Sequence, residues 1–211
     1  MARELKYKIL MYYSIVYILF FTGRAILNRN YEFLYYTSVI ILLILFVGLY
    51  YKSFQLSFPL LVGLTILGSL HILGGDLSIG GIRLYDFWFI NGVLRYDNLM
   101  HIIGTFLATL IVYNLISPHL QLKKMHHPIL CALFLILIVA GIGTTNEILE
   151  FGAVVFLDAA EQVGDYFNNT LDLIFNVVGS VIACVFIYVY YKKPFEFTKN
   201  YIKRRLERRD V

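Results

Sequence analysis

The chain has 211 residues, of which 59% are hydrophobic and only 15% are charged. Soluble domains usually carry about a quarter charged residues, so this composition excludes an ordinary soluble protein and indicates an integral membrane protein. The net charge of +4 is not a signal for a nucleic-acid partner. Cys131 and Cys184 both lie in apolar runs, which indicates neither a disulfide framework nor a thiolate metal site.

Six apolar segments are predicted to cross the bilayer, because most of them approach the roughly 20 residues that a bilayer core requires. They are Ile9–Thr22, Phe33–Tyr51, Phe54–Gly74, Asn98–Ile116, Pro128–Phe156 and Thr170–Tyr191. Only Lys52 and Ser53 separate the second span from the third, which predicts a tight antiparallel hairpin. We expect an all-α polytopic bundle of about six spans, with residues 1–191 as a single transmembrane domain and residues 192–211 as a basic tail.

The distribution of basic residues predicts the orientation of these spans. Of the 18 lysines and arginines, only Arg24, Arg29, Arg83 and Arg95 fall in the loops opposite the termini. Cytoplasmic loops are enriched in basic residues, so both termini are predicted to be cytoplasmic in a multi-pass protein of the cell (plasma) membrane. The tail is predicted to rest on anionic inner-leaflet lipid or, alternatively, to bind a partner.

The outer loop Gly74–Asn98 contains five glycines, three aspartates and Trp88, the single tryptophan of the chain. Its middle, Leu84–Leu94, is too short and too interrupted to span the bilayer. Two interpretations remain open: an interfacial or re-entrant segment that caps a cavity, or an ordinary loop anchored by aromatic residues at the membrane surface.

One layer of polar side chains is predicted near the outer face, delivered by helices that alternate in direction. Glu147 follows Pro128 by nineteen residues, about 28 Å of helix, which returns it to the outer leaflet. His71, at the outer end of the third span, and Asp165, in the loop before the sixth, are expected to support the layer. The predicted polar cluster consists of Asp97, His101, Glu147, Glu150, Asp172 and Asn176.

Ionisable groups inside a bilayer are costly, so this cluster is the strongest functional signal in the sequence. Carboxylates crowded into a low-dielectric site cannot all ionise unaided, so the site either retains protons or holds a cation. One histidine with several carboxylates suits one divalent ion such as Zn, Mn, Fe or Mg.

A structural interpretation of the same residues is also open. Asp97 could cap the fourth helix, and residues 168–170 could cap the sixth. Asn176 and His101 could join helices by hydrogen bonds, while Gly179 allows close helix approach.

The order and spacing of these residues resemble the VanZ-like and YjdF-like families of small bacterial membrane proteins, over residues 96–183. The matching pieces are Tyr96-Asp97-Asn98-Leu99-Met100-His101, Asn146-Glu147-Ile148-Leu149-Glu150-Phe151, Gly164-Asp165 with Asn169-Thr170-Leu171-Asp172, and Asn176-Val177-Val178-Gly179. The VanZ-like pattern has Lys at the position of Asn98 and Gln at that of Glu150, and the second departure is closer to the YjdF-like pattern. VanZ-like proteins are associated with low-level resistance to teicoplanin, a glycopeptide that acts at the outer face of the cell membrane. The resemblance implies the helical fold and the polar cluster, and names no substrate.

Three functions are consistent with these residues. The first is a metal-dependent hydrolase or transferase that acts on a membrane lipid or lipid-linked envelope precursor, with His101 or Glu147 as the general base and the other carboxylates holding the ion. The second is a proton- or cation-linked binder or transporter of a cation or amphiphile, gated by Glu147 and Glu150. The third is a non-catalytic envelope protein whose cluster only fixes helix packing.

Overall fold

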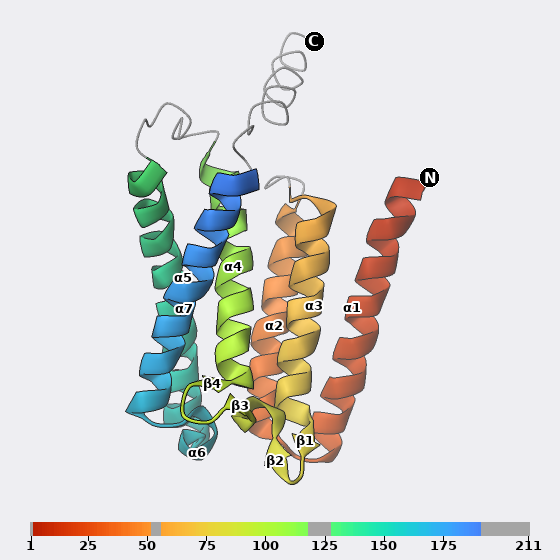
Figure 1. The fold of residues 1–211 in the computed structure, drawn as a ribbon. Helices are drawn as coiled ribbons and strands as arrows, with labels where there is room; N and C mark the ends of the chain where they lie inside the picture. The colour runs from red at the N-terminus through yellow and green to blue at the C-terminus, as the bar shows by residue number, and fades with distance from the viewer. Residues whose placement is uncertain (1, 52–55, 118–127, 191–211) are drawn as a thin grey trace.

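A computed structural model describes residues 2–51, 56–117 and 128–190 of the chain. Within these ranges, six helices are long and apolar enough to cross a membrane, so the predicted all-α, six-span fold is confirmed. They are α1 (Ala2–Leu27), α2 (Tyr31–Tyr50), α3 (Phe58–Asp76), α4 (Tyr96–Ile116), α5 (Pro128–Leu157) and α7 (Tyr166–Tyr190). The helices form one bundle (Figure 1). The cytoplasmic orientation stays a prediction, and the predicted basic tail lies outside the described residues.

Helices α1 and α7 begin four or more residues earlier than their apolar stretches predict. Helix α1 begins at Ala2 rather than Ile9, because charged residues such as Glu4 and Lys6 are good helix formers and extend the helix beyond its apolar part. Helix α7 begins at Tyr166 rather than Thr170, because the Asp165 carboxylate accepts a hydrogen bond from the Asn168 backbone N–H at 3.0 Å.

The connection between α2 and α3 is longer than predicted. Helix α3 begins at Phe58 rather than Phe54, since Ser57 is its N-cap and a proline occupies its first turn. Before it, the Leu56 backbone N–H donates a hydrogen bond to the Tyr51 carbonyl at 3.0 Å. The predicted two-residue hairpin, Lys52 and Ser53, is therefore wrong in its length.

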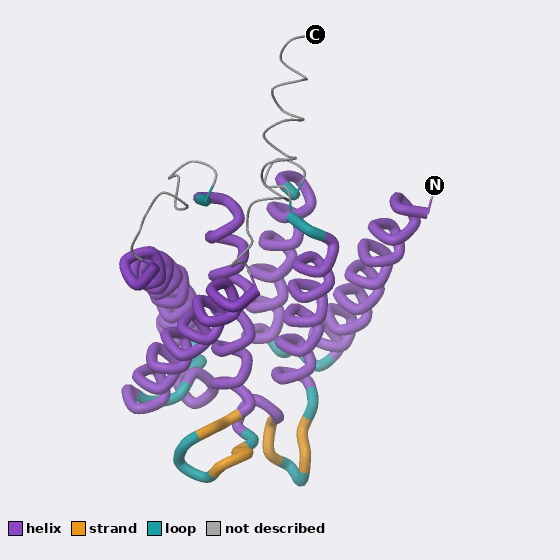
Figure 2. The backbone as a smooth tube through the Cα atoms, turned by 45° about the horizontal axis from the view of Figure 1, so that its top comes forward, coloured by secondary structure: helices purple, strands orange, loops and turns teal. Residues whose placement is uncertain are grey.

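The segment between α3 and α4 folds into two short antiparallel strand pairs and one helical turn. These are β1 (Ser78–Ile79) with β2 (Ile82–Arg83), η1 (Leu84–Asp86), and β3 (Trp88–Ile90) with β4 (Leu94–Arg95). Both hairpins lie at one end of the bundle (Figure 2). Helix α6 (Ala160–Val163) lies at this end too, where α3 and α5 finish and α4 and α7 begin. We call it the hairpin end.

Helices α4 and α7 make the closest contact in the bundle. At Gly179 of α7, the Ile102 carbonyl and the Thr105 hydroxyl of α4 occupy the space that a side chain would need. The glycine therefore lets two backbones approach directly, as membrane helices with small residues do and as the sequence predicts. Beyond this contact, an apolar cluster between α4, α5 and α7 fills the bundle with Val112, Leu135, Val139 and Ile187.

Candidate functional site

His101 of α4 is the centre of the predicted polar cluster. Its ring is buried, with 8% of the side chain exposed, and carboxylates approach both of its nitrogens. Nε2 lies 3.6 Å from Asp97 Oδ1 and 3.7 Å from Asp172 Oδ1. Nδ1 lies 3.8 Å from Glu147 Oε1 and 3.1 Å from Asn176 Oδ1. The structure thus brings residues of α4, α5 and α7 around one imidazole.

Two asparagines orient the carboxylates of the cluster. The Asn98 amide donates a hydrogen bond to Asp172 Oδ1 at 2.7 Å, and the Asn146 amide donates one to Glu150 Oε1 at 2.8 Å. Asn98 also accepts a hydrogen bond from the Arg95 backbone N–H at 2.9 Å, which caps the first turn of α4. The structural interpretation expected Asp97 to cap α4, but Asn98 provides this cap. Asp97 faces His101 instead.

Several buried polar atoms in the cluster have no hydrogen-bond partner among the described residues. They are Asp172 Oδ2, both carboxylate oxygens of Glu147, and Asn176 Nδ2. Asp172 is fully buried, at 0% exposure. An unpaired buried polar group normally costs about 1–3 kcal/mol, and more when it is charged. So many unpaired atoms around one histidine are typical of a site that a ligand completes.

Two groups of side chains have the composition and spacing to hold a metal ion: Asp97, His101 and Asp172, and His101, Glu147 and Glu150. In each group one ligand atom per residue lies within 4.8 Å of the others. Ligands about 2.1 Å from an ion are roughly 3.0–3.4 Å apart. The separations of 3.6 and 3.7 Å around Nε2 exceed a hydrogen bond and are close to that spacing.

The two supporting residues have different positions. His71 of α3 lies at the hairpin end, where its Nδ1 shares a hydrogen bond with the Tyr85 hydroxyl. Burial, and then the nearby carboxylates of Asp97 and Glu150, raise the pKa of the Tyr85 phenol well above its usual value, so the phenol stays protonated. Asp165 is exposed and caps α7, so the structure gives it a local structural role. The predicted capping of α7 by residues 168–170 is wrong, because Asp165 provides the cap.

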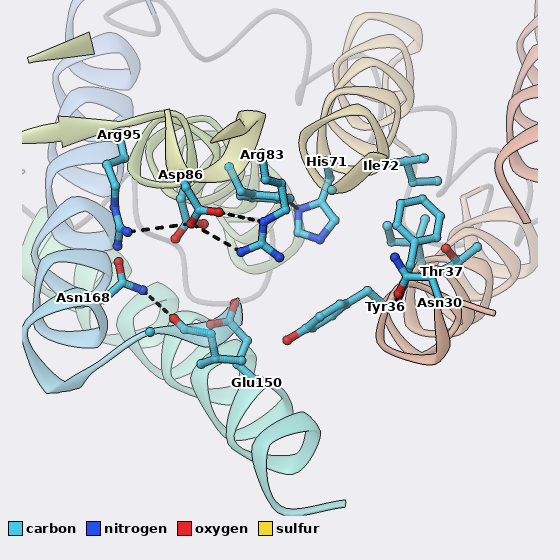
Figure 3. A pocket seen from close by; sticks show the side chains of 17 residues that line it. Asn30, Tyr36, Thr37, His71, Ile72, Arg83, Asp86, Arg95, Glu150 and Asn168 are labelled. Carbon is cyan, nitrogen blue, oxygen red and sulfur yellow. Dashed lines mark hydrogen bonds and ion pairs between the residues drawn. The ribbon is translucent and has the colours of Figure 1, made fainter. Parts of the chain in front are cut away.

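A cavity of about 360 Å³ adjoins the cluster at the hairpin end, and we call it the end cavity. Asp97 and Glu150 belong to the cluster and also line the end cavity. Its other charged lining residues are Arg83, Asp86 and Arg95 of the hairpin segment, while Phe33, Ile40 and Ile72 of α2 and α3 provide an apolar lining. Figure 3 shows Arg83, Asp86 and Arg95 on one side, with Tyr36, Thr37 and Ile72 opposite. The hairpin segment therefore lines a cavity, as the first interpretation of the outer loop expects, while its interfacial or re-entrant placement stays a prediction.

A comparison with protein families gives one result that decides the relationship of this chain. The family described as "Predicted membrane protein (DUF2238)" matches residues 9–193, which is most of the sequence. The chain belongs to the DUF2238 family. The match runs from residue 9, within α1, through α7 and includes every residue of the cluster and of the end cavity. No curated protein and no solved structure matches this DUF2238 chain.

Sequence reasoning missed two contributors to the site of this DUF2238 protein. Asn98 orients Asp172 across 74 residues, and its polar character at the start of an apolar span was the available signal. The lining from Tyr36 of α2 and from Asn30, the N-cap of that helix, had no comparable signal. Polar and aromatic residues near the end of a span are common at any membrane surface.

Proposed function

We propose that this membrane protein is a metal-dependent hydrolase or transferase that acts on the polar part of a lipid or lipid-linked envelope precursor. The observation that carries the proposal is the position of His101 Nε2 between Asp97 and Asp172, beside a cavity that two of the cluster's carboxylates line. The resemblance to the VanZ-like and YjdF-like families agrees with a role at the cell envelope.

The hydrogen bond between His101 and Asn176 favours one of the two candidate ligand groups. If Nδ1–H donates to Asn176 Oδ1 at 3.1 Å, the lone pair of the ring lies on Nε2. Metal-binding histidines typically donate their other ring N–H to an oxygen in this way, which fixes the tautomer and the ring orientation. Nε2 then faces Asp97 and Asp172, so these three residues are the proposed ligands.

Glu147 is the proposed general base. Its two oxygens are buried and lack hydrogen-bond partners in the described part of the chain, and Oε1 lies 3.8 Å from His101 Nδ1. A divalent ion at the three ligands would lower the pKa of a bound water and polarise a substrate oxygen. Glu147 would accept the proton that the water loses, and Glu150, held by Asn146, would line the substrate side.

The packing away from the hairpin end favours an enzyme or binder over a transporter. The apolar cluster of Val112, Leu135, Val139 and Ile187 fills the space between α4, α5 and α7 on that side. The buried polar side chains described there are hydroxyls such as those of Thr109 and Ser117, whereas ion and proton pathways in membranes use ionisable side chains. A site that opens at one end suits a substrate that enters and leaves from the same membrane face.

Elemental analysis of the detergent-purified protein tests the proposal. The wild type should contain about one divalent ion per chain, and Asp172→Asn should lose it. Glu147→Gln should keep the ion and lose activity, because it changes the base and leaves the ligands intact. Asp158→Asn, which changes an exposed acid at the same end of the bundle, is the matched control and should keep the ion.

Each other outcome has a defined meaning. Loss of the ion in Glu147→Gln but not in Asp172→Asn would move the site to the second ligand group, with His101 and Glu150. Wild-type protein that remains metal-free after incubation with Zn, Mn, Fe and Mg would refute a metal-dependent enzyme. The cluster would then be a proton-holding binding site or a packing element.

A further inference from the structure

The end cavity is amphipathic, which limits the kind of molecule that it can hold. Two guanidinium groups and one carboxylate form its hairpin side, whereas α2 and α3 contribute aromatic and aliphatic side chains. Figure 3 shows the two groups of side chains facing each other across the space, with His71 between them. Its volume of about 360 Å³ falls within the roughly 300–1,000 Å³ of small-ligand sites.

The two arginines are held in place by one aspartate. Asp86 accepts hydrogen bonds from Arg83 Nε at 2.9 Å and from Arg83 Nη2 at 3.3 Å, and it lies 4.0 Å from Arg95 Nη1. Arg95 also stacks on the Trp88 ring, with its guanidinium carbon 5.1 Å from the ring centre. Two guanidinium groups therefore contact one carboxylate on this side of the cavity.

Arg95 lines the cavity, and one of its hydrogen-bond donors has no partner in the described part of the chain. Its Nε is buried without a hydrogen-bond partner in the residues that the structure describes, and only 15% of its side chain is exposed. Arginine binds phosphate through paired N–H groups, which makes it the common choice where a phosphate must be held in one orientation. A buried, preoriented guanidinium with an open donor is therefore suited to an oxyanion.

We propose that the end cavity binds the phosphate group of an amphiphile, with Arg83 and Arg95 on the anion and the chain along Phe33, Ile40 and Ile72. This inference rests on the proposed metal site, because Asp97 and Glu150 also line the cavity and would repel a phosphate if nothing neutralised them. A divalent ion at Asp97 would reduce that repulsion. The substrate class is thus a phosphate ester with an apolar chain.

Trp88 provides a built-in reporter for the test, because it is the single tryptophan of the chain and contacts Arg95. Purified protein in a maltoside detergent is titrated with dodecyl phosphate, with inorganic phosphate and with dodecyltrimethylammonium, and Trp88 emission is recorded. Dodecyl phosphate should give a saturable change. Inorganic phosphate should bind at least about tenfold more weakly, and the cationic amphiphile should give no saturable change.

Substitution of each arginine shows whether Arg83 and Arg95 bind the phosphate group. Arg83→Gln should weaken dodecyl phosphate binding by about tenfold to a hundredfold, and Arg83→Lys should recover part of the loss. Arg95→Gln should show the same loss by calorimetry, which does not depend on the Trp88 contact. Arg24→Gln is the matched control and should bind as the wild type does, because Arg24 pairs with Asp76 at 3.3 Å, and neither residue lines the cavity.

The outcomes separate this inference from the proposed function. If both glutamine variants bind dodecyl phosphate as the wild type does, or if all amphiphiles bind alike, the phosphate site is refuted while the metal site stands. If inorganic phosphate binds equally well, the anion site stands but its apolar partner is refuted. If phosphate binding depends on both arginines in a protein that holds no metal, the metal-dependent function fails and the anion site survives, with retained protons in place of an ion neutralising Asp97 and Glu150.

Discussion

Replacement of Asp172 by Asn separates the charge of the proposed metal ligand from its shape. The side chain is fully buried, and its Oδ1 accepts the Asn98 hydrogen bond at 2.7 Å. An asparagine has nearly the same volume and keeps an oxygen that can accept this bond. The variant therefore removes one negative charge and one ligand atom while the packing between α4 and α7 is preserved.

The expected effect on stability follows from binding linkage. An ion present at 100 times its dissociation constant stabilises the folded state by about 2.7 kcal/mol. A chain of this length shifts its midpoint by about 2–4 °C per kcal/mol, so the wild type should melt about 5–11 °C higher with metal than with EDTA. Asp172→Asn should shift by less than about 2 °C. In EDTA it should melt at the same temperature as the wild type or higher, since an uncompensated buried charge has been removed.

Thermal unfolding in detergent, followed by Trp88 emission, measures these shifts for the wild type and for Asp172→Asn. Asp158→Asn is the control for loss of an exposed acid and should shift as the wild type does. A full metal-dependent shift in Asp172→Asn would refute the assignment of Asp172 as a ligand. A wild-type protein that no divalent ion stabilises would refute the metal site itself.

Two further predictions concern packing and pH. Gly179→Ala should destabilise the protein by about 1–3 kcal/mol and lower its metal affinity, because the added methyl would overlap the Ile102 carbonyl. Gly141→Ala, where the space is open, should be neutral or stabilising in the same thermal unfolding assay. Tyr85→Phe should cost about 1–3 kcal/mol, since it leaves the buried His71 Nδ1 without its hydrogen-bond partner. Because folding raises the pKa of Tyr85 above its usual 10.0, its contribution should be complete below about pH 10 and be lost as the pH rises further, which unfolding of wild type and variant at pH 8 and 10.5 would measure.

The spans and the depth of the cluster could be predicted because both depend on local sequence. An apolar run of bilayer length indicates a helix, and its rise of about 1.5 Å per residue then fixes the depth of Glu147 or Asp172. The hairpin end was less predictable. Strands of two or three residues have too few side chains to show a period, and Arg83 contacts Asp86 across the short helical turn η1, which the sequence pattern did not reveal.

Hydrogen-bond partners within the cluster could not be assigned from sequence for a related reason. Asp97 and Asn98 are neighbours at the start of α4, and either side chain can cap a helix. Which of them does so depends on what each faces across the bundle. Asn98 faces Asp172 and also caps the first turn, whereas Asp97 faces His101. A sequence pattern identifies the residues that could cap the helix, but it does not show how one helix is rotated against another.

The parallel contact between α4 and α7 fixes the geometry of the polar cluster. The end cavity is lined on one side by a different part of the chain, the hairpin segment. Asp172, Asn176 and Gly179 follow one another at helical spacing, so the close approach at Gly179 also brings Asp172 and Asn176 to His101. The proposed chemistry therefore depends on two rigid helices. Selection of the ligand depends on the hairpin segment with Arg83, which contributes to the cavity and not to either metal-ligand group. Changes in the hairpins can thus alter which molecule binds while the metal ligands stay in place.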